Sequence, residues 1–446
     1  MSDARRQQRL NRLRQLGLRQ VNRPISSQPP SSAESASSPH FTYETYLNQP
    51  DIPNTPTSIE LLIPEGKVIE NSYGHYFSYQ ARYPLNHHHG NRSLAKTPTI
   101  PFSFVSNITK DDSWLELNWH QVLFVDLETT GLEIGAGTIP FLIGLGYYDF
   151  DHQDFVVHQY FMRDLDEESP LLHDLFDLTD RFEAVVSFNG KTFDLPLLEN
   201  RFTLARLIPE LIDAPHFDLL HPSRRIWRQR LENCRLSTLE AELLGVQRTT
   251  ADVPGYLIPT LYHKYLTDND ARLMAGIFYH NELDILSMST LIACLAEHFT
   301  LLDQPTPTDI FDPRDIFSVG LWCLHLRHYD QAEQLLTLAL GQSLPQTLHQ
   351  RAKTELAYLL KRQKRFDEAE PLWQELVLEA DPLTALEELA KFYEWHRHDF
   401  ESALTCINFA LSQLEEGQAW HLAEVKIAWE HRKARVSKKV DSQTDR

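Results

Sequence analysis

One segment constrains the fold more than any other: VLFVDL, residues 122–127, is apolar without interruption until the acid near its end. A short continuous apolar run is typical of a strand that is buried on both faces. Two more strand-like segments follow, FLIGLGYYDF (141–150) and DFVVHQYFM (154–162), and they predict the two arms of a hairpin. The sequence therefore predicts a sheet that contains at least these three strands.

Helical and strand-like patterns alternate after the hairpin. In order, they predict a helix at 169–182, a strand at 184–190 and a helix at 195–205. From about Thr267 the apolar spacing predicts one long helix that ends before Pro305. Three strands, a helix, a strand and a helix favour an α/β fold, with a mixed sheet flanked by helices, over a bundle or a sandwich.

The chain beyond Asp309 has a different pattern, helix after helix with an internal repeat. The segments YDQAEQL, FDEAEPL and FESALTC align on Ala332, Ala369 and Ala403, which are 37 and 34 residues apart. A period of 34 residues is that of tetratricopeptide repeats. This part resembles three such repeats, which implies an all-α solenoid that binds a protein partner.

Two acids close the first strand, in the segment Asp126-Leu127-Glu128-Thr129-Thr130-Gly131. Side chains alternate along a strand, so Asp126 and Glu128 point to the same face. Two adjacent carboxylates resist ionisation unless a cation lies between them. Hard oxygen ligands of this kind suit Mg²⁺ or Mn²⁺ rather than zinc.

Two more acids lie on later elements. Asp194 opens a helix directly after a strand, where a carboxylate can alternatively cap backbone amides. His280 and Asp284 are four residues apart on the long helix, so they share a face, whereas Tyr279 points elsewhere. A His–Asp pair of this kind can also be a simple surface hydrogen bond.

The three motifs together, in this order, resemble those of DEDD 3′–5′ exonucleases. More closely, residues 120–300 resemble the YprB-type RNase-H-like family, whose blocks are similar to DLETTGL, SFNGKTFDLPLLENRF, RLSTLEAELLG, DVPGYLIP and YHNELDILSM. The YPLNHHHG segment before this domain and the repeats after it also resemble that family. The resemblance implies an RNase-H-like mixed sheet and a metal-dependent nuclease.

The resemblance also implies roles for residues. Asp126, Glu128 and Asp284 would hold one Mg²⁺ or Mn²⁺ ion that activates water, and Asp126 with Asp194 would hold a second. A fifth residue would orient or deprotonate the water. The DEDD pattern leaves Tyr279 and His280 as alternatives, and helical geometry with the basicity of imidazole favours His280.

Three residues are candidates for substrate binding. Thr130 and Leu132 resemble positions that contact the terminal nucleotide, although turn geometry and core packing explain them equally well. Asn189 is a candidate contact to the substrate backbone, or simply shapes the strand-to-helix turn. The run His87 to His89 is more typical of a polar turn than of a metal site.

We therefore expect four parts. They are a basic disordered tail and linker (1–40), a partly extended lead-in (41–115), an RNase-H-like exonuclease domain (116–303) and tetratricopeptide-like helical repeats (310–435). No apolar run of membrane-spanning length occurs, the N-terminus lacks the apolar region of a secretory signal, and the cysteines show no CxxC spacing. These features predict a cytoplasmic protein without a membrane partner.

Charge bears on the choice of function. The net charge of −20 disfavours tight binding of nucleic acid, but arginines gather in residues 1–25 and in the segment 224–230, where they either track phosphates or form a solvated face. The sequence predicts a 3′–5′ exonuclease acting on RNA or DNA, with a single-stranded 3′ end favoured. The alternatives are an endonuclease with the same metal chemistry and a catalytically weak nucleic-acid-binding or scaffolding protein.

Overall fold

The computed structural model describes residues 46–47, 52–131, 137–303, 311–379, 382–416 and 422–444. The chain forms two compact units. The first contains the chain up to Arg224 and residues 233–297, and the second contains residues 225–232 and the chain from His298 onward. The expected basic tail and Leu132 lie outside the described residues.

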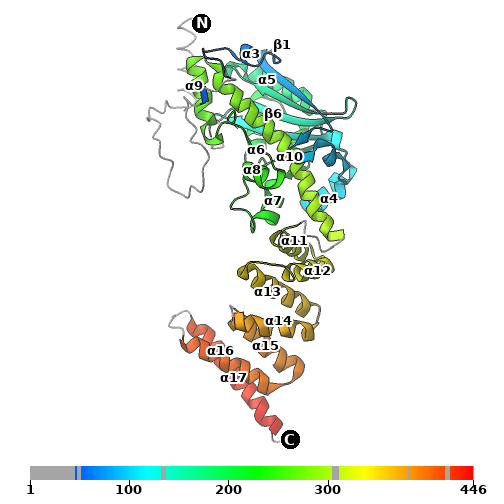
Figure 1. Cartoon of the computed structure of the whole chain (residues 1–446), viewed down its shortest axis with the longest axis vertical. Helices are drawn as coiled ribbons and strands as arrows, with labels where there is room; N and C mark the ends of the chain where they lie inside the picture. The colour runs from blue at the N-terminus through cyan, green and yellow to red at the C-terminus, as the bar shows by residue number, and fades with distance from the viewer. Residues whose placement is uncertain are drawn as a thin grey trace. The chain divides into compact units, whose positions relative to one another are not determined.

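A seven-stranded mixed sheet forms the centre of the first unit (Figure 1). Its order is β1 (Lys67–Asn71), β2 (Gly74–Pro84), β7 (Asp154–Phe161), β6 (Pro140–Asp149), β5 (Val122–Thr129), β8 (Ala184–Ser187) and β9 (His216–Asp218). Neighbouring strands from β1 to β5 are antiparallel, whereas β8 and β9 run parallel to β5. The predicted strand and hairpin, and the α/β class, are confirmed.

The lead-in segment contributes directly to this sheet. Strand β2 pairs with β7 from Phe77, opposite Phe161, to Pro84, opposite Asp154. Adjacent residues of β2 serve opposite faces: Tyr76 donates a hydrogen bond to Asp174 of α5 (Glu168–Thr179), whereas the Phe77 ring packs on Phe278 of α10 (Met274–Asp303). Chain that precedes β5 therefore helps to build both layers of the unit.

The long helix predicted from about Thr267 begins only at Met274, so that prediction was wrong in its start. Helix α9 (Ile258–Asp268) ends where Asn269 adopts a left-handed conformation with φ of 55°. The Asp270 side chain then accepts a hydrogen bond from the Arg272 amide and caps a short 3-10 turn before α10 begins. Asparagine tolerates the left-handed region and so ends the helix. The other described α-helices of this unit are α3 (Ile59–Leu62), α4 (Phe102–Thr109), α6 (Asp194–Ala205) and α8 (Leu236–Leu239). Helix α7 (Leu220–Trp227) begins in this unit, and its residues from Arg225 belong to the second.

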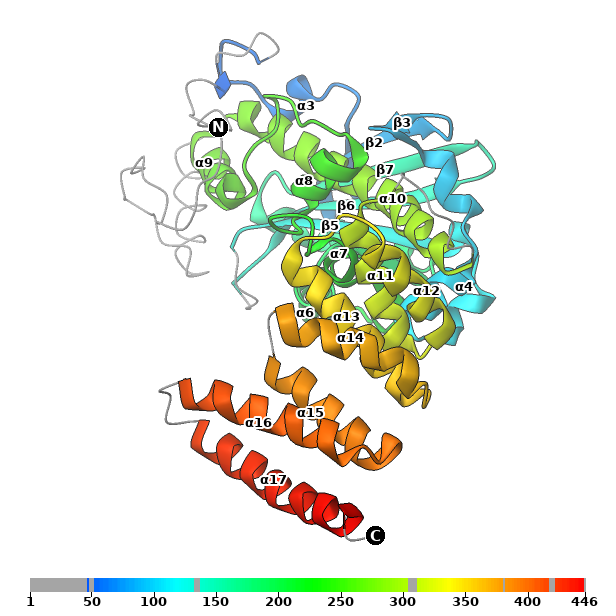
Figure 2. The ribbon, with the colours of Figure 1, turned by 60° about the horizontal axis from the view of Figure 1, so that its bottom comes forward.

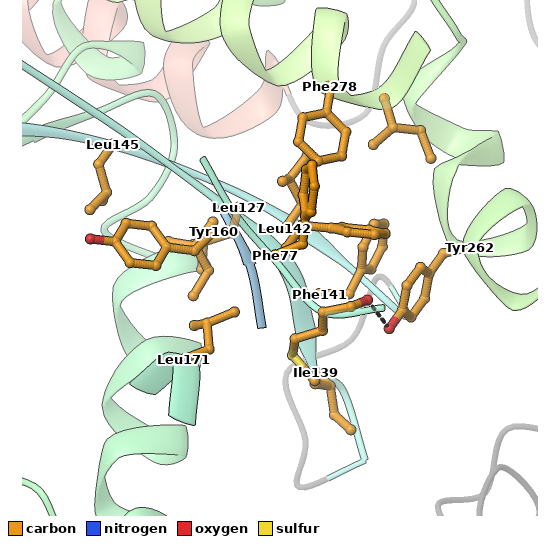
Figure 3. Packing of buried hydrophobic residues seen from close by; sticks show 14 of the residues in the cluster. Phe77, Leu127, Ile139, Phe141, Leu142, Leu145, Tyr160, Leu171, Tyr262 and Phe278 are labelled. Atoms are coloured by element: carbon orange, nitrogen blue, oxygen red, sulfur yellow. Dashed lines mark hydrogen bonds between the residues drawn. The ribbon is translucent and has the colours of Figure 1, made fainter. Parts of the chain in front are cut away.

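The main core fixes α10 against the sheet (Figure 3). The Phe141 and Tyr262 rings stack with centroids 3.8 Å apart, and the Tyr262 hydroxyl donates a hydrogen bond to the Met162 carbonyl at 2.9 Å. Gly144 of β6 must be a glycine because α10 approaches this strand closely: a Cβ on Gly144 would lie 2.1 Å from Asn281 Oδ1. The backbone of β6 and helix α10 are therefore held at a fixed separation, next to the acids of β5.

The second unit is helical (Figure 2). Its helices are α11 (Pro313–Leu326), α12 (Tyr329–Leu340), α13 (Gln346–Arg362), α14 (Phe366–Glu379), α15 (Pro382–Phe392), α16 (Phe400–Glu416) and α17 (Leu422–Thr444). Ala332, Ala369 and Ala403 are each fully buried near the start of α12, α14 and α16. The predicted all-α region after the α/β region is confirmed. Within the described residues, every helix is too short or too polar to cross a membrane.

Residues 225–232 belong to the helical unit, although the chain on both sides of them belongs to the first unit. Arg230 Nη1 lies 2.8 Å from Asp315 Oδ2 on α11, and His298 Nε2 lies 3.3 Å from the same oxygen. The Asp315 side chain is fully buried. The Arg225 guanidinium lies over the Trp322 ring, 5.0 Å from its centroid. Two arginines of the basic cluster therefore stabilise helix packing.

Candidate active site

Strand β5 presents two acids to the face of the sheet that α10 covers. Asp126 Oδ2 accepts a hydrogen bond of 2.7 Å from Asn281 of α10, and Gln159 of β7 donates to Asn281 Oδ1 at 2.8 Å. These bonds fix the Asp126 carboxylate. Glu128 is two residues further along the same strand, just before a bulge, and so projects to the same face.

Asp194 approaches the same site from the turn that follows β8. Asn189 in this turn has a φ of 69°, and Asp218 accepts hydrogen bonds from the amides of Asn189 (2.9 Å) and Lys191 (3.2 Å). Asp218 thus stabilises the turn. Asp194 is the buried first residue of α6, and within the described chain its side chain makes no hydrogen bond, so the alternative capping role does not account for it.

Helix α10 brings His280 and Asp284 together. His280 Nε2 lies 3.8 Å from Asp284 Oδ2, and the other ring nitrogen lies 2.7 Å from Asp252 Oδ1. Both side chains are largely buried, with 16% and 15% of the side-chain surface exposed. Tyr279 interacts with Tyr83 instead. The pKa of Tyr83 is raised by burial, by Glu282 and by Tyr279. Of the two candidates for the fifth position, His280 is the one beside the acids.

Burial raises the pKa values of three acids of the cluster. Burial and the Asp284 charge raise the pKa of Asp126 to about 7. Burial raises the pKa of Glu128 well above its usual value, with Asp126 adding to the effect and His280 opposing it. Burial and Asp126 likewise raise the pKa of Asp194. The four acids are therefore close enough for their charges to interact.

His280 shows the opposite effect. Burial alone would lower the pKa of the imidazole, but Asp284 and Asp252 outweigh burial and raise the pKa to about 10. His280 is therefore a cation in the metal-free protein at neutral pH. Its Nδ1–H donates to Asp252, which leaves Nε2 on the side of Asp284.

Arg248 is the second cation beside the cluster. Its guanidinium makes two hydrogen bonds to Glu240, of 2.6 and 2.8 Å, and an ion pair with Asp284. Sequence reasoning missed Arg248, Glu240 and Asp252. Two of them lie in the RLSTLEAELLG and DVPGYLIP blocks, which carried the family resemblance but no recognisable chemical motif.

The run of histidines contributes to this network. The prediction of a polar turn was wrong for His89, which is buried in the short strand β3 (His88–His89). Its Nε2 lies 2.7 Å from Ser287 Oγ, and Ser287 donates to Glu240 at 2.6 Å. Burial lowers the pKa of His89 to about 4, so the ring is neutral. The serine proton is committed to Glu240, so the neutral ring donates from Nε2 to Ser287.

The candidate substrate-binding residues have structural partners. The Thr130 hydroxyl accepts a hydrogen bond from the Ile139 amide at 3.0 Å and is buried. The Asn189 side chain accepts one from the Thr192 hydroxyl at 3.2 Å. Both contacts shape turns beside the acids. Leu132 lies outside the described residues.

The four acids have the oxygen ligands that a divalent cation needs, but their side chains are not arranged as a metal site. Asp194 is buried and Glu128 is half-buried, and among the described residues neither side chain receives a hydrogen bond. Carboxylates of this kind need a cation. In the described part of the chain, however, no three or more His, Cys, Asp or Glu side chains converge as a metal site requires. Asp284 is instead directed to Arg248.

The fold and these acids define a class of protein. Residues 123–296 match the RNase_H_2 family, which is described as part of the RNase_H superfamily. This superfamily suggests nuclease activity and binding of nucleic acid, and its nucleases generally use divalent metal ions.

A comparison with curated proteins is more specific. The chain is 32% identical over 338 residues to the protein named "Uncharacterized protein YprB" from Bacillus subtilis (strain 168). The alignment covers 75% of this chain and 79% of that relative. The chain therefore belongs to the YprB family, as the sequence motifs predicted.

Proposed function

We propose that the first unit is a 3′–5′ exonuclease that hydrolyses nucleic-acid phosphodiester bonds with two divalent metal ions. One observation supports this proposal above the others: the buried Asp194 and the half-buried Glu128 have no hydrogen-bond donors among the described residues, and their charges interact with those of Asp126 and Asp284. A protein retains such a cluster at a cost in stability, which metal binding offsets.

The residues divide the work as follows. Asp126, Glu128 and Asp284 would hold one Mg²⁺ or Mn²⁺ ion, and Asp126 with Asp194 would hold the second. Bound ions of this type lower the pKa of water and neutralise charge on the phosphate. Asn281 keeps the Asp126 carboxylate oriented through its 2.7 Å hydrogen bond.

His280 is proposed as the general base. Asp252 accepts the Nδ1 proton at 2.7 Å, which orients the ring and directs Nε2 toward the side of Asp284. The raised pKa of about 10, which arises because Asp284 and Asp252 outweigh burial, belongs to the metal-free protein. Positive charge brought to Asp284 weakens that cause, so the imidazole can lose its proton and accept one from water.

The test uses full-length protein and end-labelled oligonucleotides. We expect Mn²⁺ or Mg²⁺ to support stepwise shortening from the 3′ end, with single strands preferred, and EDTA to abolish it. Parallel RNA and DNA substrates identify the nucleic acid. Glu128→Gln should abolish activity, whereas Glu199→Gln, an exposed acid on α6, should retain it. Internal fragments would indicate an endonuclease, and no product from any substrate would refute the proposal.

A second function has one observation in its favour. In the described residues the acids do not converge as a ready metal site, because Asp284 is paired with Arg248. An RNase-H-like unit with this pairing could instead bind nucleic acid without cleaving it. Wild-type protein that binds an oligonucleotide equally well in EDTA and in Mn²⁺, and never shortens it, would establish this alternative.

The helical unit is proposed to be a set of three tetratricopeptide-type repeats that binds a protein partner in the cytoplasm. The buried alanines Ala332, Ala369 and Ala403, each near the start of the second helix of a pair, support this assignment. Exposed apolar side chains such as Tyr358 and Leu378 are candidate contacts. Replacing both with serine should weaken binding of a partner but leave oligonucleotide hydrolysis unchanged.

A further inference from the structure

The Arg248 guanidinium lies where a cation is expected beside Asp284. Its Nη2 atom pairs with Asp284 Oδ1, and its Nη1 atom is 3.5 Å from Asp252. The arginine side chain is only 12% exposed. Within the described part of the chain, Asp284 is the acid of the cluster that pairs with an arginine.

The arginine is also anchored by Glu240. Its Nε and Nη2 atoms donate to Glu240 at 2.6 and 2.8 Å, and Glu240 also accepts from the Ser287 hydroxyl at 2.6 Å. The His89 ring supports Ser287 in turn. Three donors therefore hold a fully buried carboxylate, and this carboxylate holds the guanidinium fork.

Asp284 is held by fewer hydrogen bonds than Glu240 among the described residues, because Arg248 donates one to Asp284 whereas Glu240 accepts three. It sits on a regular helical segment with 15% of its side chain exposed, and only rotation of the side chain is needed to redirect its oxygens. His280 approaches the other oxygen of Asp284, with Nε2 3.8 Å from Oδ2. Arg248 Nη1 also lies 3.0 Å from His280 Nδ1, an approach of two cations that the surrounding acids make possible.

We propose that Arg248 is a resident cation that holds Asp284 in the metal-free protein, so that Asp284 must leave the guanidinium before a divalent ion can bind. This inference rests on the proposed function of the acids. A ligand that is paired internally lowers the apparent affinity for metal, because only the fraction of molecules with a free ligand is competent. The fixed positive charge also repels an incoming cation. Arg248 is thus a positioning residue that sets how much metal the site needs.

The test measures Mn²⁺ binding to the full-length protein by isothermal titration, without nucleic acid. The double variant Arg248→Met/Glu240→Gln removes the ion pair without a change in net charge and keeps an acceptor for Ser287. We expect it to bind Mn²⁺ about tenfold more tightly than wild type, or tighter still. The matched control is Arg163→Met/Glu167→Gln, a half-buried pair of the same unit whose atoms are 2.7 Å apart, and it should bind as wild type does.

Each outcome of this titration tests either the role of Arg248 or the proposed function. Equal or weaker binding by the double variant, with the control unchanged, would overturn the role of Arg248 and leave the proposed function intact. No Mn²⁺ binding by wild type or any variant would overturn the proposed function itself. If the double variant does not fold, Arg248→Lys replaces it. A single ammonium cannot hold Glu240 and Asp284 as a fork does, so a smaller tightening is expected, and its absence would overturn the inference.

Discussion

Replacing Asp126 with asparagine should stabilise the metal-free protein at alkaline pH. Burial and the charge of Asp284 raise the pKa of Asp126 from 3.8 to about 7. One pKa unit corresponds to about 1.4 kcal/mol, so the ionised carboxylate lowers the free energy of unfolding by at most about 4 kcal/mol. An asparagine has no charge, and its Oδ1 atom can still accept the 2.7 Å hydrogen bond from Asn281.

The gain in the free energy of unfolding should increase as the pH rises. A carboxyl whose pKa is raised on folding is protonated in both states below its unfolded pKa, so the variant gains little there. The gain appears as the pH rises above the unfolded value and is complete above about 7, the folded pKa. We expect about 1 kcal/mol at pH 4.5 and about 4 kcal/mol at pH 8.

Hydrogen exchange of backbone amides in β5 and β6 measures this effect in the first unit alone. Protection in EDTA should rise in Asp126→Asn at pH 8 and rise much less at pH 4.5, whereas Glu199→Gln should match wild type at both. Saturating Mn²⁺ should reverse the order, because a bound ligand stabilises only the protein that binds it. An equal gain at both pH values, or none at pH 8, would refute the electrostatic reasoning.

Three other changes test separate parts of the structure. His280→Ala should lower the turnover number by about 10²–10⁴-fold, whereas Tyr279→Phe should change it little; the reverse result in a steady-state assay would exclude His280 as the base. Asp252→Asn removes one of the two charges that outweigh burial, so the pKa of His280 in the metal-free protein should fall below about 10, as an NMR titration would show. Asp315→Asn leaves Arg230 without its buried partner and should destabilise the helical unit by about 3 kcal/mol, and thermal melts that match wild type would contradict this.

Much of the fold could be predicted because its signals are local. The apolar run that becomes β5, and the two arms that become β6 and β7, each specify a strand within a few residues. The acids of β5 and the His280–Asp284 pair lie on regular elements, so alternation and helical spacing predict which of them share a face.

The remaining features depend on contacts between distant parts of the sequence. Arg248 and Asp252 lie between regular elements, where no periodicity indicates a direction, and they meet His280 and Asp284 only when α10 packs on the sheet. His89 is buried by Ser287, 198 residues away. The break between α9 and α10 was not predicted. A single left-handed residue, Asn269, interrupts the helix there, while the apolar pattern of the sequence continues.

Anomalous diffraction from crystals of the full-length protein grown with Mn²⁺ tests the metal site most directly. We predict two peaks in the first unit, one bound by Asp126, Glu128 and Asp284 and the other by Asp126 and Asp194, with Asp284 turned away from Arg248. A map at saturating Mn²⁺ without a peak at these carboxylates, and with Asp284 still paired to Arg248, would contradict a two-metal nuclease.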